Sequence, residues 1–143
     1  VVAFAVTLTR PAWKATAQVQ ASVEDLPLVL ADEARLTQVL VHLLLNAVGA
    51  LPGPDLENNR IQIHAEFDDT HLRLQVTDNG RGIAATTLNR IFDPFFTTKP
   101  VGQGVGLGLS IAHSLVASMG GELTCTSTSA AGTCFTVSLA RAP

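Results

Sequence analysis

Four glycines stand at every second position between Gly102 and Gly108, directly before an apolar stretch with a helical period. Glycine lets the backbone approach a ligand closely. A helix N-terminus offers unpaired N–H groups and a partial positive charge, so the two features together predict a phosphate-binding site. The alternative interpretation is a flexible loop before an ordinary helix. The residues expected at the phosphate site are Gly102, Gly104, Val105, Gly106, Leu107 and Gly108.

The spacing of these glycines excludes two common nucleotide-binding motifs. The Walker motif ends in Gly-Lys-Ser/Thr, and this chain contains no Gly-Lys pair. The dinucleotide motif needs glycine at its first, third and sixth positions. Counted from Gly102 the sixth residue is Leu107, and counted from Gly104 it is Leu109, so the motif fails in both registers.

A second glycine-rich segment, residues 78–83, follows an alternating apolar stretch that predicts a strand. Its sequence Asp-Asn-Gly-Arg-Gly-Ile contains Asn79-Gly80, a strong turn signal, but a tight turn does not account for Gly82. In the functional interpretation Asp78 ends the strand and accepts a hydrogen bond from a ligand amine, while the glycines let a flat ring approach the backbone. This segment alone supports the structural and the functional interpretation equally.

Two side chains, Asn46 and Lys99, have the chemistry to bind a cation or a phosphate. Asn46 lies within about a quarter turn of a helical apolar stripe, so its side chain is expected to be half-buried. An asparagine there needs a partner, and its amide oxygen is also a neutral ligand for a hard cation such as Mg²⁺. Lys99 precedes the glycines and would meet phosphate as a point charge. The aromatic residues of segment 92–96 are equally typical of a small satellite core under a loop.

Composition narrows the class of protein. The chain has 143 residues, 47% of them hydrophobic and 15% charged, and a formal net charge of −3. These values fit one folded domain and argue against disorder and against a protein that binds nucleic acid. No apolar run approaches the roughly 18 residues of a membrane span, and we expect no signal peptide. We expect Cys125 and Cys134 to be small buried thiols that face each other across the last hairpin, and no redox pair.

Hydrophobic periodicity predicts an α+β fold, with a largely antiparallel sheet and helices on one face. Residues 1–12 are compatible with the end of a helix or with a strand, and Pro11 interrupts either. We expect residues 1–13 to be the remnant of a preceding helix or a linker, and residues 14–143 to be one domain. The strands are expected at residues 14–22, 61–67, 72–76, 122–126 and 134–139, and the helices at residues 33–51, capped by Asp32, and 106–119.

The order of these motifs resembles the catalytic ATP-binding domain (HATPase_c) of bacterial sensor histidine kinases. The nitrogen-regulation and dicarboxylate-sensing type, which carries Thr-Thr-Lys-Pro before its glycines, is most similar. The domain belongs to the GHKL superfamily, shared with gyrase-type topoisomerases, mismatch-repair ATPases and heat-shock chaperones. The resemblance covers about residues 14–140. It implies a two-layer α/β sandwich, with a mixed sheet of about five strands and about three helices on one face.

The resemblance also implies roles for individual residues. Asn46, in the N box, would bind Mg²⁺, and Asp78, in the first glycine box, would bind the adenine amino group with support from Thr133 in the last box. Segment 92–96 looks like the F box, and segment 102–109 like the second glycine box, which hinges a lid over the phosphates. Asn46 and Lys99 are the expected catalytic residues. The residues expected to bind the nucleotide are Asn46, Asp78, Gly80, Gly82, Ile83, Lys99, Gly102, Gly104, Val105, Gly106, Leu107, Gly108 and Thr133.

Three departures from the family pattern qualify this assignment. The position four residues before Asn46 is commonly Asn in histidine kinases and Glu in the relatives that hydrolyse ATP, but here it is His42. The absent Glu argues for phosphoryl transfer to a protein acceptor. Gly49 and Ala50 stand where many kinases have a phosphate-contacting Lys or a Tyr. We therefore expect phosphate binding to depend more on Lys99 and on backbone N–H groups. None of the four histidines has the sequence context of a phosphoacceptor.

The resemblance implies that the chain is the ATP-binding catalytic domain of a kinase whose phosphoacceptor histidine lies on another domain. The chain would bind ATP with Mg²⁺ and donate the γ-phosphoryl group to a histidine on a separate dimerisation domain of the same protein, which then phosphorylates a response regulator. We expect the isolated domain to be a cytoplasmic monomer that contacts neither nucleic acid nor membrane, although the parent could be anchored in the inner membrane. The alternatives are a GHKL-type ATP hydrolase and an inactive ATP-binding or interaction module.

Overall fold

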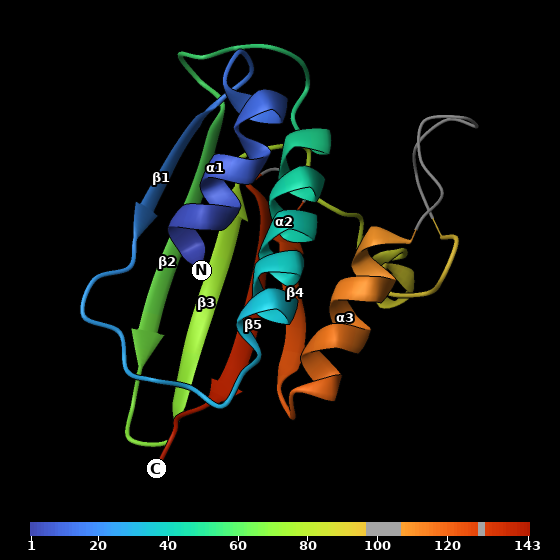
Figure 1. The fold of residues 1–143 in the computed structure, drawn as a ribbon. Coiled ribbons are helices and arrows are strands. Elements are labelled where there is room, and N and C mark those ends of the chain that lie inside the picture. Colours follow the sequence, from blue (N-terminus) through green and yellow to red (C-terminus); the bar gives the residue numbers. More distant parts are fainter. Residues whose placement is uncertain (97–106, 129–130) are drawn as a thin grey trace.

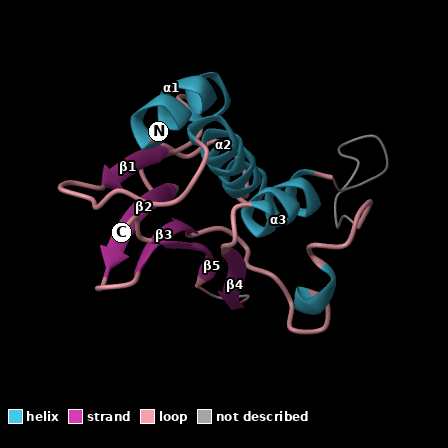
Figure 2. Ribbon diagram, turned by 60° about the horizontal axis from the view of Figure 1, so that its bottom comes forward, coloured by secondary structure: helices cyan, strands magenta, loops and turns pink. Residues whose placement is uncertain are grey.

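The computed structural model describes residues 1–96, 107–128 and 131–143. It has two layers, a five-stranded sheet and a set of helices that covers one of its faces (Figures 1 and 2). This arrangement confirms the predicted α+β sandwich. The elements in chain order are α1 (Val2–Trp13), β1 (Gln18–Ser22), α2 (Glu33–Gly49), β2 (Arg60–Phe67), β3 (His71–Asp78), the short 3-10 helix η1 (Leu88–Arg90), α3 (Gly108–Ser118), β4 (Glu122–Thr128) and β5 (Gly132–Ala140).

The strands are arranged in the order β1-β2-β3-β5-β4. Only the pair β1–β2 is parallel, so the sheet is mixed but mainly antiparallel, as predicted. β3 and β5 are neighbours although most of the second half of the chain separates them. Their register places Asp78 opposite Thr133, and Ser127 of β4 lies opposite Thr133 on its other side. Asp78, Thr133 and Ser127 thus lie side by side on three neighbouring strands of the sheet.

The helix α2 is central to the covering layer and contacts both α1 and α3 (Figure 1). The Asp32 side chain accepts a hydrogen bond from the Arg35 N–H at 2.9 Å, which confirms the predicted cap. The spacing i, i+3, i+4, i+7 points one stripe of the helix at the sheet, where it contacts β2 and β3. The buried residues of α2 are Leu36, Val39, Leu40, Leu43, Leu44 and Ala47.

The first strand is shorter than the alternation of residues 14–22 predicts. Residues 2–13 form a helix that continues through Pro11, and the Thr16 and Ala17 N–H groups donate to the Trp13 carbonyl, so β1 begins only at Gln18. Ala5 of α1 is fully buried in the common core. Within the described ranges, no helix is long and apolar enough to cross a membrane.

The expectation that the two cysteines face each other across the last hairpin is wrong. Cys125 lies opposite Phe135 in the β4–β5 register, and Cys134 lies opposite Thr126, so the two thiols point to opposite faces of the sheet. Both cysteines are free and half-buried. Burial, with smaller contributions from Cys134 and Asp78, raises the pKa of the Cys125 thiol to about 12. Cys125 is therefore a protonated core side chain and not a reactive thiolate.

Candidate functional site

Asp78 is the last residue of β3 and is buried, with 2% of its surface exposed. Its Oδ1 accepts a hydrogen bond from the Gly80 N–H at 2.9 Å. Burial raises the pKa of the Asp78 carboxyl, although hydrogen bonds from the Gly80 and Thr133 N–H groups and the charge of Arg81 lower it in part. A buried carboxylate whose pKa is perturbed in this way is a candidate for a functional residue.

The first glycine segment packs tightly on the C-terminal end of α2. A Cβ on Gly80 would overlap the Ala50 carbonyl oxygen, so only glycine fits at this position. Arg81 fixes the contact, because its N–H donates to the Ala50 carbonyl at 3.1 Å and its guanidinium donates to the Gly49 carbonyl at 3.1 Å. Gly82 has a φ of +72°, which favours glycine. Both glycines therefore have structural roles beside the functional one that we expect.

The segment called the last box, Gly132 and Thr133, packs directly against Asp78. Gly132 has a φ of +92°, and a Cβ on it would overlap the Asp78 carbonyl oxygen. This close approach lets Thr133 lie directly beside Asp78 in the β3–β5 register, and the Thr133 side chain is buried. Asp78, Gly80, Gly82, Ile83 and Thr133 are thus brought together at the same edge of the sheet.

Ser127 is a residue of this site that sequence reasoning did not identify. Its Oγ accepts a hydrogen bond from the Ile83 N–H at 2.6 Å and lies 3.0 Å from Thr133 Oγ1. It therefore joins the first glycine segment to the last box. The alternation of residues 122–128 carries a signal for its orientation, because Leu123, Cys125 and Ser127 share one face, but only the register with β5 gives it a partner.

The second half of α2 carries Asn46 and His42. Asn46 is half-buried, as predicted, and lies one helical turn before Ala50. His42 lies one turn earlier, and its Nδ1 is close to Gly108, 3.4 Å from the place that a Cβ there would occupy. The N-cap residue of α3, Leu107, provides no side-chain cap, so the first-turn N–H groups have no side-chain acceptor from it.

His42 carries a buried Nε2 with no hydrogen-bond partner, the one such side-chain atom within the described part of the chain. Burial lowers the pKa of the His42 imidazole below its ordinary value near 6.5, so the ring is neutral at pH 7. The neutral ring adds no charge to the N-terminus of α3.

The aromatic segment 92–96 packs partly on the core. Phe92 stacks on His113 of α3 with ring centroids 4.8 Å apart and meets Phe135 edge-on at 6.3 Å. Phe95, in contrast, is 72% exposed. The remaining residues of the predicted site, Lys99, Gly102, Gly104, Val105 and Gly106, lie outside the described residues.

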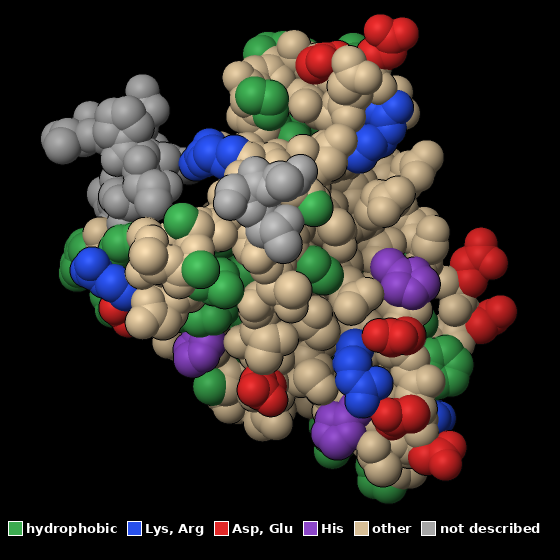
Figure 3. Space-filling view, turned by 180° about the vertical axis from the view of Figure 1, so that it is seen from behind, with side chains coloured by type: hydrophobic (Ala, Val, Ile, Leu, Met, Phe, Trp, Pro, Cys, Tyr) green, Lys and Arg blue, Asp and Glu red, His purple; other side chains and the backbone are tan. Residues whose placement is uncertain are grey.

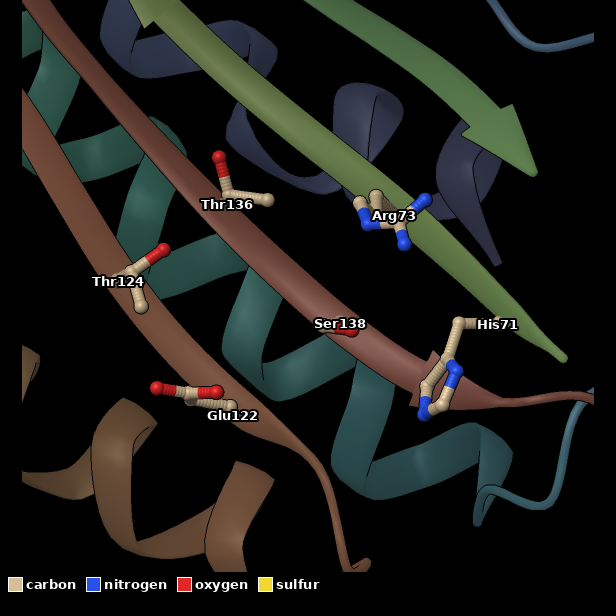
Figure 4. A pocket seen from close by; sticks show the side chains of 6 residues that line it. All are labelled: His71, Arg73, Glu122, Thr124, Thr136 and Ser138. Atoms are coloured by element: carbon tan, nitrogen blue, oxygen red, sulfur yellow. The ribbon is translucent and has the colours of Figure 1, made fainter. Parts of the chain in front are cut away.

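A shallow polar hollow of about 370 Å³ lies elsewhere, on the uncovered face of the sheet (Figures 3 and 4). None of the residues predicted to bind a nucleotide lines it. The arginine in its lining, Arg73, is already paired with Asp68 at 2.9 Å. Its lining side chains belong to β3, β4 and β5 and are His71, Arg73, Glu122, Thr124, Thr136 and Ser138 (Figure 4).

The fold is that of histidine kinase catalytic domains. Full-length ShkA, solved in complex with AMPPNP, superposes with a TM-score of 0.82 and 32% identity, over 99% of this chain and 30% of that one. The chain belongs to the family of histidine kinase-, DNA gyrase B- and HSP90-like ATPases, whose profile matches residues 31–143.

Curated relatives are sensor kinases of the type that the sequence resembles. The sensor histidine kinase ZraS of Escherichia coli K12 is 40% identical over 114 residues, which are 80% of this chain and 23% of ZraS. The C4-dicarboxylate transport sensor protein DctB of Rhizobium meliloti is 41% identical over 113 residues, 79% of this chain and 17% of DctB. The chain thus spans less than a quarter of the length of these relatives.

Proposed function

We propose that the chain binds ATP with Mg²⁺ and donates the γ-phosphoryl group to a histidine on a separate phosphoacceptor domain of the same protein. The observation that carries the proposal is the register of β3 and β5, which sets the buried Asp78 beside Thr133 and against the first glycine segment. Family membership and the AMPPNP in the ShkA complex support a nucleotide ligand.

Asp78 and Thr133 would bind the adenine. The Asp78 carboxylate accepts from the exocyclic amine, and Gly82 and Ile83 supply the backbone surface for the ring. Gly80 would also lie against the nucleotide, and in addition it lets this segment pack closely on Ala50. The uncapped first turn of α3, at Leu107 and Gly108, faces the phosphates with its N–H groups. We propose that Lys99 and the glycines from Gly102 to Gly106, with Val105, hold the rest of the phosphate chain.

Asn46 is the residue that would hold Mg²⁺. Within the described ranges, no group of three or more His, Cys, Asp or Glu side chains could hold a metal ion by itself. A single amide oxygen fits Mg²⁺ that takes its other ligands from water and from nucleotide phosphates, the usual pattern for this ion. When bound, Mg²⁺ would neutralise charge on the phosphates. Because phosphoryl transfer needs mostly positioning and charge neutralisation, this chain needs few reactive side chains of its own.

The partners follow from the proposed kinase function. The attacking imidazole would come from the phosphoacceptor domain, and a response regulator would receive the phosphoryl group next. We propose that residues 14–143 are the catalytic domain and that residues 1–13 end a preceding helix or linker, even though α1 packs on α2. We also propose that the domain is a cytoplasmic monomer.

The alternative functions make different predictions in two assays. Calorimetric titration with ATP and Mg²⁺ should show saturable binding, whereas an inactive interaction module without a nucleotide site would give no binding heat. Steady-state release of inorganic phosphate by the isolated chain should stay at background, because His42 replaces the Glu that activates water in the hydrolases of this superfamily. Sustained phosphate release would support the hydrolase instead.

A further inference from the structure

We propose that Asn79 is a positioning residue for nucleotide binding, because its side chain fixes the point at which the chain leaves β3 and turns towards α2. The inference rests on the proposed function, which assigns Asp78 to the base and Asn46 to Mg²⁺ at the phosphates. It adds a residue whose side chain binds other parts of the protein and acts on the nucleotide only through its neighbours.

The backbone ladder between β2 and β3 ends one residue before Asn79. Its last pair is Ile61 with Asp78. At the next position the Asn79 N–H still donates to the Arg60 carbonyl at 3.2 Å, but the Arg60 N–H donates to Oδ1 of the Asn79 side chain at 2.8 Å. In an antiparallel pair the backbone would make both bonds. The side chain of Asn79 therefore replaces its own carbonyl as the partner of Arg60, and the backbone is free to turn away from the sheet.

The second bond of this side chain reaches the loop of residues 50–59, between α2 and β2. Asn79 Nδ2 donates to the Asn58 carbonyl at 2.7 Å. The loop is itself fixed by Asn59, which is 5% exposed and donates through Nδ2 to the carbonyls of Gly53 at 2.6 Å and Thr16 at 3.0 Å. Both donor positions of this buried amide are used, which holds the loop in one place. Asn79 is thus bound to a rigid partner.

The turn that Asn79 holds determines the path from Asp78 to α2. Gly80 follows directly and packs on Ala50, and Asn46 lies one helical turn before Ala50. A looser turn would let the Asp78 carboxylate move relative to α2. A nucleotide bound at both places would then have to order the turn on binding, which lowers its affinity.

The test is calorimetric titration of the whole chain with Mg-ATP, below its melting temperature. Asn79→Ala should weaken binding about fivefold, the effect of one hydrogen bond, with an unchanged number of sites per chain. A merely structural loss would reduce the fraction of chains that bind and leave the affinity of the folded fraction unchanged. Should Asn79→Ala not fold, Asn79→Ser, whose side chain is too short to make both bonds, gives the same reading.

Gln18→Ala is the matched control. Gln18 Nε2 donates to the Leu56 carbonyl of the same loop at 2.8 Å, but Gln18 lies on β1, away from β3. This variant should bind Mg-ATP as the wild type does. Hydrogen exchange of the Arg60 amide reports the Asn79 bond itself, and the amide should exchange faster in Asn79→Ala but not in Gln18→Ala.

The two measurements together separate the possible results. If the Arg60 amide loses protection while Mg-ATP affinity stays within about twofold of wild type, the inference is wrong and the proposed function stands. An equal loss of affinity in Gln18→Ala, or a loss in Asn79→Ala with the Arg60 amide still protected, would also overturn the inference. If the wild-type chain binds no Mg-ATP, the proposed function fails and the inference with it.

Discussion

Replacing Asp78 by asparagine tests the adenine assignment directly. The substitution keeps the shape of the side chain and its acceptor for the Gly80 N–H, which lies 2.9 Å from Oδ1, but removes the charge. A hydrogen bond to a charged group contributes about 1.5–3 kcal/mol, so the loss should weaken ATP binding about 10- to 150-fold. Isothermal titration with Mg-ATP measures the effect. Binding within about twofold of wild type would refute the assignment.

The stability of the same variant gives an independent check. Burial raises the pKa of Asp78 in the folded chain above its unfolded value, so the folded state binds the proton more tightly. The stabilisation from the protonated form is lost as the pH rises through the folded pKa, and at pH 7 the ionised carboxylate lowers the free energy of unfolding. Neutral asparagine avoids this cost, and the melting temperature should not fall.

Asp68→Asn is the matched control with opposite behaviour. Asp68 lies in the turn between β2 and β3, where hydrogen bonds from Thr70, His71 and Arg73 hold its pKa well below the ordinary range. Its stabilising contribution is present at neutral pH, so the substitution should lower the melting temperature. It should leave ATP binding unchanged. A drop in ATP affinity in both variants would mean that the titration reports folding and not adenine recognition.

Two further predictions concern the packing between α2 and its neighbours. Gly80→Ala should lower the free energy of unfolding, measured by urea denaturation, by about 1–3 kcal/mol, because the added methyl group would overlap the Ala50 carbonyl. Gly108→Ala is the control and should cause no loss, because its methyl group would lie at an ordinary contact distance from His42. Equal losses in the two variants would contradict this prediction. His42→Asn should flatten the pH dependence of the free energy of unfolding. Burial lowers the pKa of His42 in the folded chain, so the unfolded chain takes up a proton first as the pH falls. The stability of the wild-type chain should therefore fall below about pH 6.5. Parallel curves for variant and wild type between pH 7.5 and 5.5 would contradict it.

Local signals in the sequence predicted the elements well. The Asp32 cap, the apolar stripe of α2 and the alternation of the β2–β3 hairpin are encoded within short windows, and each appears in the structure. The end of α1 was less predictable. Alternation in residues 14–17 looks like a strand, but the helix that precedes it continues to Trp13 and leaves these residues in a turn.

Long-range pairing is what the sequence could not supply. Nothing in the alternation of β5 says that it lies between β3 and β4, so the contact of Asp78 with Thr133 came only from a family resemblance. Ser127 was missed for the same reason, since its partners Ile83 and Thr133 come from other segments. The cysteine error is a register error of one residue, which turns a side chain to the opposite face.

The central claim is that this chain transfers phosphate to a histidine that it does not contain. The most direct test supplies the chain with ATP labelled on the γ-phosphate, Mg²⁺ and a phosphoacceptor helical hairpin from the parent protein. The account predicts label on the hairpin histidine with the wild-type chain, and none with Asn46→Ala, which should still retain some ADP affinity. Label released only as inorganic phosphate, or equal transfer rates with Asn46→Ala, would contradict it.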